Sequence, residues 1–300
     1  MKISEVATRE EIARFNERSD WQGAKLVVYN WATVAAIFAA VAWWTNPLTI
    51  LAALLLLGGR QLGFAALMHD CGHGLLFRSA WANEHIGQWL CAYPILSDQP
   101  RYALGHLKHH AFAGTDKDPD LPNYQAYPIS KQSFRRKVWR DVTGQTGWKA
   151  LKATWRRGKQ DLGKAPWNGN ALAGHLIVNG AMFAALAASG HALLYLLWPI
   201  AHVTSYMLIA RLRQVAEHGA TPDLYDLDPR LNTRTVYVKW WEKPFVAPYN
   251  LNYHLEHHFR ADVPCYHLKD FHAFLKSKGV YEKTAFPNGY HELFAGVVRG

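Results

Sequence analysis

Residues 26–44 read LVVYNWATVAAIFAAVAWW and contain no acidic or basic side chain. As a helix, this run is long enough to cross about 30 Å of hydrocarbon. Residues 45–47 (TNP) predict a tight turn, and residues 48–67 form a second apolar run that Arg60 and Gln61 interrupt. Because a charge is costly in lipid, Arg60 should face protein or lie near the membrane surface. The stretch 26–67 therefore predicts a transmembrane helical hairpin.

A second pair of apolar runs follows later in the chain, with a short turn at residues 189–191 between them. We therefore expect an all-α integral membrane protein with two transmembrane helical hairpins. The four expected spans are residues 26–44, 48–67, 169–188 and 192–210. Residues 69–168 and 211–300 are expected to form a helical cap outside the membrane. Residues 1–300 would then be a single domain.

The distribution of charge predicts how the chain is oriented. Lys and Arg number 33 against 23 Asp and Glu, a formal net charge of +10. The basic excess lies in residues 1–25, 101–168 and 211 onward, and the two predicted turns have none of it. By the positive-inside rule both termini and the long loop are cytoplasmic. Thirteen tryptophans favour a membrane interface over nucleic acid as the partner of the basic surface.

Two further features bear on the environment of the chain. Cys71, Cys91 and Cys265 are odd in number and far apart, which indicates reduced thiols. No signal peptide is evident before the first apolar run. Within residues 101–168, apolar residues recur at helical spacing among basic ones, which is typical of helices lying in the headgroup plane or of surface helices of a soluble cap. These residues are Phe134, Val138, Trp139, Val142, Trp148, Leu151 and Trp155.

Three short clusters hold half of the 16 histidines. They read HDCGH at residues 69–73, HLKHH at 106–110 and HLEHH at 254–258. On a helix, positions i, i+3 and i+4 share a face, so each cluster should present its imidazoles from one side. By the predicted topology all three clusters lie near the cytoplasmic surface. The candidate ligands in them are His69, His73, His106, His109, His110, His254, His257 and His258.

His218 lies just past the last predicted span, at the same level, and is a ninth candidate ligand or a structural residue. Eight or nine imidazoles are too many for one ion and suit two ions with four or five ligands each, so the cytoplasmic helical cap is expected to hold a di-metal site. Neutral imidazole binds iron, copper and zinc, so ligand type alone does not choose the metal. The other seven histidines are expected to be structural: His85, His175, His191, His202, His267, His272 and His291.

Carboxylates beside ligating histidines orient the ring nitrogens in many metal sites. Asp70, Glu217 and Glu256 adjoin candidate ligands in sequence, and Asp118 follows the second cluster. Each of the four acidic residues is either such an orienting group or a solvent-exposed charge.

The pattern HxxxH, HxxHH, HxxHH at the ends of two hairpins resembles the membrane fatty acid desaturase family. The resemblance extends to HDCGHGLLF (69–77), HLKHHAFAGTDKDPDL (106–121) and NLNYHLEHHFRADVPCYHL (250–268), and it covers residues 26–280. It implies two iron ions (Fe²⁺/Fe³⁺) bound by the nine histidines, and it suggests Gln214 as a residue that holds a metal-bound water. Relatives often have a proline two residues after the third cluster, where this chain has Phe259-Arg260-Ala261.

The resemblance also implies oxidation of an unactivated C–H bond of a lipid acyl chain with O2 and two electrons. Neither a glycine-rich dinucleotide motif nor a fused haem motif is found, so the electron donor would be a separate ferredoxin-like or cytochrome-like protein. Desaturation is the leading interpretation. Hydroxylation or ketolation of a lipid, terpenoid or carotenoid is the alternative, because the same ligands serve both.

Two alternative interpretations of the histidine clusters involve no oxidation. A metal transporter should place its ligands near the bilayer midplane, whereas the predicted topology places the histidine clusters at one face of the membrane. A structural zinc protein needs only about four ligands for each ion.

Overall fold

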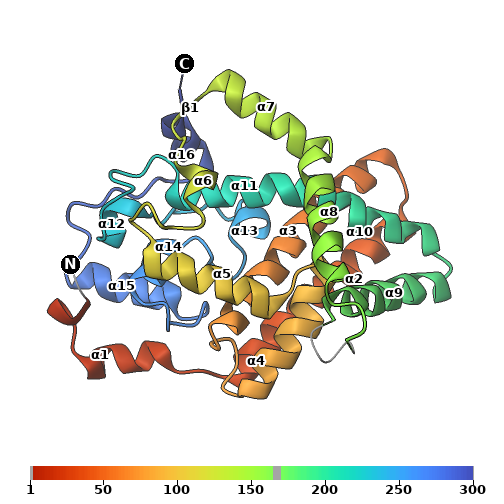
Figure 1. Cartoon of the computed structure of the whole chain (residues 1–300), viewed down its shortest axis with the longest axis horizontal. Helices are drawn as coiled ribbons and strands as arrows, with labels where there is room; N and C mark the ends of the chain where they lie inside the picture. The colour runs from red at the N-terminus through yellow and green to blue at the C-terminus, as the bar shows by residue number, and fades with distance from the viewer. Residues whose placement is uncertain (1–2, 165–169, 300) are drawn as a thin grey trace.

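The computed structural model describes residues 3–164 and 170–299, and these form a mostly helical chain (Figure 1). Four segments are long and apolar enough to span a membrane. They are α2 (Asp20–Trp43), α3 (Pro47–Gly72), α9 (Ala171–Ala188) and the segment Ala192–His218, which contains η6 (Ala192–Leu196), α10 (Leu197–Val203) and α11 (Ser205–His218). The prediction of a mostly helical chain with four candidate spans is confirmed.

The remaining elements are shorter. Before α9 the chain forms η1 (Ile3–Glu5), α1 (Arg9–Ala13), η2 (Arg14–Asn16), α4 (Ala80–Ile86), a π-helical turn η3 (Gly87–Ala92), η4 (Tyr93–Ile95), α5 (Gln99–Phe112), α6 (Leu121–Tyr124), α7 (Lys131–Val142) and α8 (Gln145–Lys159). After α11 it forms α12 (Pro229–Asn232), α13 (Lys243–Val246), η7 (Pro248–Asn250), α14 (His254–Phe259), α15 (Leu268–Ser277) and α16 (Tyr290–Val297). A two-residue parallel bridge joins β1 (Ile129–Ser130) to β2 (Val298–Arg299).

The first two helices extend beyond the apolar runs that predicted them. Ser19 caps α2 by accepting from the backbone N–H of Gln22, so the helix begins six residues before the predicted run. Helix α3 continues past the predicted end at residue 67 to Gly72 and carries His69 on its last turns. Helix α9 begins after the cap Asn170, and its predicted start at residue 169 lies outside the described residues.

The last predicted span, 192–210, is a broken helix. The backbone of Thr204 leaves helical geometry at φ −117°, ψ −89°, and it separates α10 from α11. Beside the break, the Ser205 hydroxyl donates to the carbonyl of Leu54 on α3 at 2.5 Å. Average hydropathy does not register a break of one residue, so the sequence showed only one continuous apolar run.

Helix α3 is the centre of the fold and packs against α2, α5, α10, α11 and α13. The two polar residues that interrupt its apolar run face protein, as predicted for Arg60. Arg60 donates to the carbonyl of Pro244 at 2.6 Å and is buried, and Gln61 donates to the carbonyl of Trp198 at 3.0 Å. Both side chains therefore tie α3 to neighbouring elements, where lipid would leave them without partners.

The amphipathic segment forms α7 and α8, and its aromatic residues are exposed. Trp139, Trp148 and Trp155 are 64%, 59% and 52% exposed. Phe134 instead packs on Phe294 of α16. In Figure 1, α7 lies along the upper edge of the molecule, and α8 descends from it across the front toward α9. Location in the headgroup plane remains a prediction for these helices.

Glycine allows α3 to approach α11 closely. A Cβ atom at Gly58 would lie 2.5 Å from Ser205 Oγ and 2.9 Å from the backbone nitrogen of Tyr206. We expect Gly58→Ala to destabilise the protein by about 1–3 kcal/mol through overpacking. Thermal unfolding of the detergent-solubilised protein by circular dichroism measures this. Gly180→Ala on α9 is the control, since no atom of the described residues outside the adjacent backbone of α9 lies within 4 Å of its Cβ position. Equal melting temperatures for the two variants would contradict the tight contact.

Candidate metal centre

Four elements bring the nine candidate histidines together. His69 lies near the end of α3 and His73 is its C-cap residue, while His218 ends α11. Helix α5 carries His106, His109 and His110 on its last two turns. Helix α14 consists of little more than the third cluster, from His254 to Phe259. These elements come from residues 47–72, 99–112, 205–218 and 254–259, so the site forms only when the chain folds.

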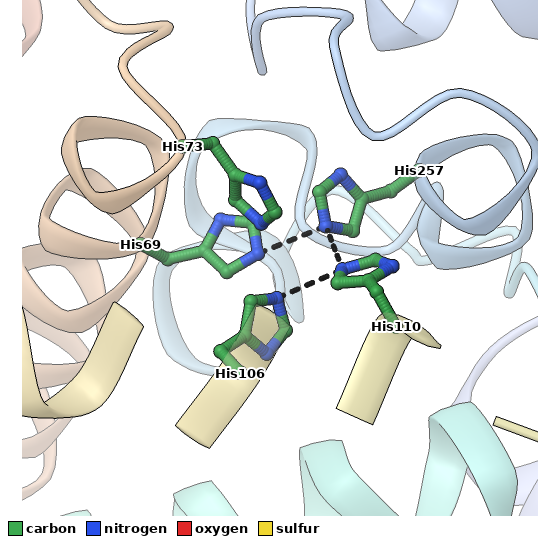
Figure 2. A group of neighbouring side chains, drawn as sticks. All are labelled: His69, His73, His106, His110 and His257. Carbon is green, nitrogen blue, oxygen red and sulfur yellow. Dashed lines mark hydrogen bonds between the residues drawn. The ribbon is translucent and has the colours of Figure 1, made fainter. Parts of the chain in front are cut away.

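The first histidine group consists of His69, His73, His106, His110 and His257, with one ring nitrogen of each within 4.8 Å of all the others. Figure 2 shows these five rings pointing toward one another from three elements. The Nε2 atom of His257 lies 3.0 Å from that of His69 and 2.9 Å from that of His110. The Nε2 atoms of His106 and His110 are 2.9 Å apart.

The second histidine group consists of His109, His218, His254 and His258 and meets the same 4.8 Å criterion. Its Nε2 atoms lie 2.9 Å apart for His218 and His254, and 3.1 Å apart for His254 and His258. His109 Nε2 is 3.3 Å from His258 Nε2.

The two groups divide the second and third sequence clusters between them. On α5, His106 and His110 are one turn apart and point into the first group, whereas His109 points into the second. On α14, His254 and His258 are one turn apart and point into the second group, whereas His257 points into the first. Neighbouring residues on a helix differ by about 100° around its axis, so one helix can serve two centres. Five and four imidazoles match the number expected for two ions.

The outer nitrogens of three rings fix where their lone pairs point. His69 Nδ1–H donates to Asp70 at 3.0 Å, and His109 Nδ1–H donates to Asp118 at 2.8 Å. The backbone carbonyl of Asn232 can only accept, so His218 Nδ1 must donate to it at 3.1 Å. A neutral imidazole has one N–H, and each of these three rings therefore directs an Nε2 lone pair inward.

This arrangement fits a bound metal at each group. Within the described residues, His73 Nε2 is buried and has no hydrogen-bond partner. His257 Nε2 has two nitrogen neighbours near 3 Å, but it can offer at most one hydrogen to them. Facing lone pairs repel, and a cation between them turns that repulsion into attraction. The donor set, nitrogen only, suits a transition metal.

Burial keeps the imidazoles in the form that binds metal. Burial, reinforced by the neighbouring imidazoles, lowers the pKa of His110 to about 2. The same causes lower the pKa of His73 to about 3 and hold the pKa values of His106, His257 and His258 well below 6.5. These rings are therefore neutral at neutral pH, with a lone pair available.

Three of the four candidate carboxylates contact cluster histidines. Asp70 accepts from His69 and from the backbone N–H of Cys265 at 2.7 Å. Asp118 accepts from His109 and from the Tyr124 hydroxyl. Burial raises the pKa of the Asp118 carboxyl, but these hydrogen bonds outweigh it, so the net shift is downward and the group stays ionised.

Glu217 connects α11 to α14. Its carboxylate is buried, pairs with Arg213 at 2.8 Å and lies 3.5 Å from His254 Nδ1. Sequence reasoning missed Arg213, although its position four residues before Glu217 is the spacing of a helical ion pair. It also missed the Asn232 carbonyl, for which the sequence holds no signal because any residue supplies a backbone carbonyl.

Glu256 and Gln214 hold other positions. Glu256 is fully buried, and it accepts from His272 Nδ1 at 2.6 Å, the Tyr281 hydroxyl at 2.6 Å and Thr235 Oγ1 at 2.5 Å. Its hydrogen bonds therefore fix the position of α14 and do not orient a candidate ligand, since none of its observed partners is a cluster histidine. Gln214 is half-buried on α11, one turn before His218, and its role as a water-holding residue remains a prediction.

The seven other histidines stand outside both groups. His272 belongs to the Glu256 network, and His175 Nε2 donates to the carbonyl of Ser97 at 2.9 Å, which agrees with structural roles. The turn after α14, where the sequence departs from the expected proline, is held by the Arg260 guanidinium on Asp262. Cys71, Cys91 and Cys265 are free and buried, as predicted for reduced thiols.

Little space is left beside the first histidine group. A cavity of about 20 Å³ is bounded by His69, His106, His254 and His257 together with Tyr249 and Leu268. A volume of this size admits about one water-sized molecule. Bulk water is therefore kept away from the inward nitrogens on this side.

The comparison with protein families decides the identity of the scaffold. A family model described as fatty acid desaturase matches residues 43–286, which include all nine histidines. The chain belongs to the fatty acid desaturase family. The resemblance found in the sequence is thereby confirmed. The desaturase family match and the four apolar helices together indicate a membrane protein.

Individual relatives share desaturation in their names. The chain is 25% identical to dihydrorhizobitoxine desaturase of Bradyrhizobium elkanii, over 81% of this chain and 72% of that protein. It is 25% identical to sn-1 oleoyl-lipid 12-desaturase of a Picosynechococcus strain, over 88% and 79%. A shorter match, 36% identical, is to sn-1 acyl-lipid omega-3 desaturase (ferredoxin) of a Synechocystis strain, over 24% and 18%.

The contact between Asp118 and His109 gives a test of the second histidine group. We expect Asp118→Ala to weaken metal binding by about 10–100-fold, because the His109 ring loses the acceptor that orients it. Asp116→Ala, an exposed acidic neighbour two residues away, is the control. Metal retained per chain after challenge with a chelator measures the effect. If both variants retain metal equally, Asp118 does not orient His109.

Proposed function

We propose that this protein is an O2-dependent di-iron membrane oxidoreductase that desaturates a lipid acyl chain. The observation that carries the proposal is the division of nine buried or half-buried histidines into groups of five and four. The family match supports an oxidoreductase acting on lipid acyl chains, and two of the three relatives are named for lipid substrates. The shared term in all three names is desaturase, which favours desaturation over hydroxylation or ketolation.

The nine histidines would hold two iron ions, the first group one ion and the second group the other. Bound iron would supply the redox reactivity toward O2 that amino acid side chains lack. Support comes from the inward lone pairs, the neutral rings and the unpartnered nitrogen of His73. Asp70 and Asp118 would keep His69 and His109 each in one tautomer and one orientation, and the Glu217 carboxylate lies beside His254.

The protein supplies position and exclusion of water. Tyr102 stacks on the His106 ring at 5.4 Å, and Tyr124 stacks on His218 at 4.8 Å, so aromatic side chains close the sides of the cage. Glu256 holds α14 through three hydrogen bonds, which fixes three of the nine rings at once. Exclusion of water from the two histidine groups would favour oxidation of the bound acyl chain over side reactions with water.

The proposed membrane arrangement follows the sequence. Helices α2 and α3 would form one transmembrane hairpin, and α9 with the broken α10–α11 segment would form the other. Both termini, the metal centre and the cap would be cytoplasmic, and residues 1–300 would act as one domain. The positive-inside distribution of Lys and Arg supports this orientation.

Electrons would come from a separate ferredoxin-like or cytochrome-like protein. One relative's name specifies ferredoxin, which supports a small redox protein as donor. The formal net charge of +10 would attract an acidic donor to the cytoplasmic face.

His257→Ala is the sharpest test of the ligand assignment. Its Nε2 atom lies within 3.0 Å of two other ring nitrogens, so its loss opens the first histidine group. We expect turnover to disappear and iron content to fall, while membrane insertion stays intact. His291→Ala, at an exposed position on α16, is the control and should keep iron and activity. Normal iron content in His257→Ala would refute the assignment.

The reaction is tested by lipid mass spectrometry of host cells with and without the expressed protein, supplied with a ferredoxin and its reductase. New lipid species two mass units lighter, with about two irons per chain, are expected for a desaturase with two complete histidine groups. Species sixteen mass units heavier would replace desaturation by hydroxylation. If protein expressed in iron-replete cells binds only zinc, the proposed oxidative function is wrong.

A further inference from the structure

An apolar groove lies apart from the metal centre, between α8, α9 and α10. Its volume is about 530 Å³, within the range of small-molecule sites. Its apolar walls include Leu151 of α8, Leu172 and Leu176 of α9, and Trp198 and Pro199 of α10. None of the nine candidate ligand histidines lines it.

Two glycines hold α8 over this groove. A Cβ at Gly147 would lie 2.3 Å from the Cα of Val203, and a Cβ at Gly158 would lie 2.9 Å from the Cβ of Leu172. The two contacts are three helical turns apart, one at the break after α10 and the other at the start of α9. The stretch of α8 between them, which contains Trp148, Leu151, Lys152 and Trp155, lines the groove.

His202, which lines the groove, has a buried ring nitrogen without a partner among the described residues. His202 is 6% exposed, and its Nδ1 atom has no hydrogen-bond partner within residues 3–164 and 170–299. The other polar groups that line the groove differ. His175 donates to the carbonyl of Ser97, and Asn179 donates to that of Tyr93 at 3.1 Å. An unpaired buried polar group lowers stability by about 1–3 kcal/mol, so a hydrogen-bonding ligand at His202 would be stabilising.

The groove also carries an exposed cation. The ammonium of Lys152 lies 5.5 Å from the centroid of the Trp148 ring, at the α8 side of the groove. Tryptophan and lysine side by side are typical of the headgroup level of a membrane. A phospholipid has acyl chains, an ester region and a charged headgroup. The apolar walls of the groove match the acyl chains, the unpaired nitrogen of His202 matches the ester region, and the ammonium of Lys152 matches the headgroup.

We propose that this groove binds one anionic phospholipid of the surrounding bilayer. One acyl chain lies against Leu172, Leu176 and Trp198. The Nδ1–H of His202 donates to an ester carbonyl of the glycerol region, and Lys152 pairs with the phosphate headgroup. This site does not rest on the proposed desaturase activity, because its lining residues belong to neither histidine group.

Native mass spectrometry of the iron-loaded, delipidated protein in detergent tests the proposal, with phosphatidylglycerol and phosphatidylcholine as probes. We expect one phosphatidylglycerol to bind more tightly than phosphatidylcholine. Lys152→Gln should weaken phosphatidylglycerol binding by about tenfold through loss of a charge-assisted contact. Lys149→Gln removes the same charge from an exposed position outside the groove and is the matched control. Equal effects of the two variants would overturn the headgroup assignment.

Two further comparisons test the depth of the site. His202→Phe preserves a ring that can stack on Tyr206, now 5.1 Å away, but removes the nitrogen. It should weaken binding of ester-linked phosphatidylglycerol and leave binding of the diether analogue, which lacks the carbonyl, unchanged. Leu176→Trp should fill the groove and abolish tight binding while iron content stays normal. Undiminished binding in either variant, measured with the ester lipid, would refute the site.

Discussion

The architecture depends on nitrogen lone pairs that face one another at about 3 Å. Such a cluster is unfavourable without a cation, because like lone pairs repel and burial removes the water that would satisfy them. Four of the nine imidazoles are held from outside by a carboxylate or a carbonyl. Asp70 contacts His69, Asp118 contacts His109, Glu217 lies beside His254, and the Asn232 carbonyl accepts from His218. These partners come from loops and helices far apart in the chain, so the metal centre and the tertiary structure stabilise each other.

Helix α3 links the membrane part of the molecule to the site. It is the most buried of the candidate spans, and it ends in the first pair of histidines. Close approach at Gly58 sets the distance between α3 and α11, which end in His69–His73 and His218. A change in how the apolar helices pack would therefore change the distances between the candidate ligands. In Figure 1, α5 and α11 extend from the side of the molecule with α9 and α10 toward the side with α12, α14 and α15.

Much of the site could be predicted because the sequence features that indicate it lie within short stretches of the chain. The spacings HxxxH and HxxHH place imidazoles on one helical face, and the count of nine indicates two centres. The division into five and four was not predictable, because it depends on how α5 and α14 are rotated against each other. Glu256 shows the same limit: it adjoins His257 in sequence, yet its carboxylate bonds to His272, Tyr281 and Thr235.

The sequence by itself determined the helical class, the four apolar segments and the candidate ligands, since hydropathy and helical periodicity are properties of short stretches. Its apolar runs missed the helix break at Thr204 and the ends of α2 and α3, because caps and tertiary hydrogen bonds set those. Only the tertiary structure decided which histidines share a group, which carboxylates reach them, and that His202 lines a groove under α8. These features are contacts between segments far apart in the chain, and the sequence pattern carries no record of their relative orientation.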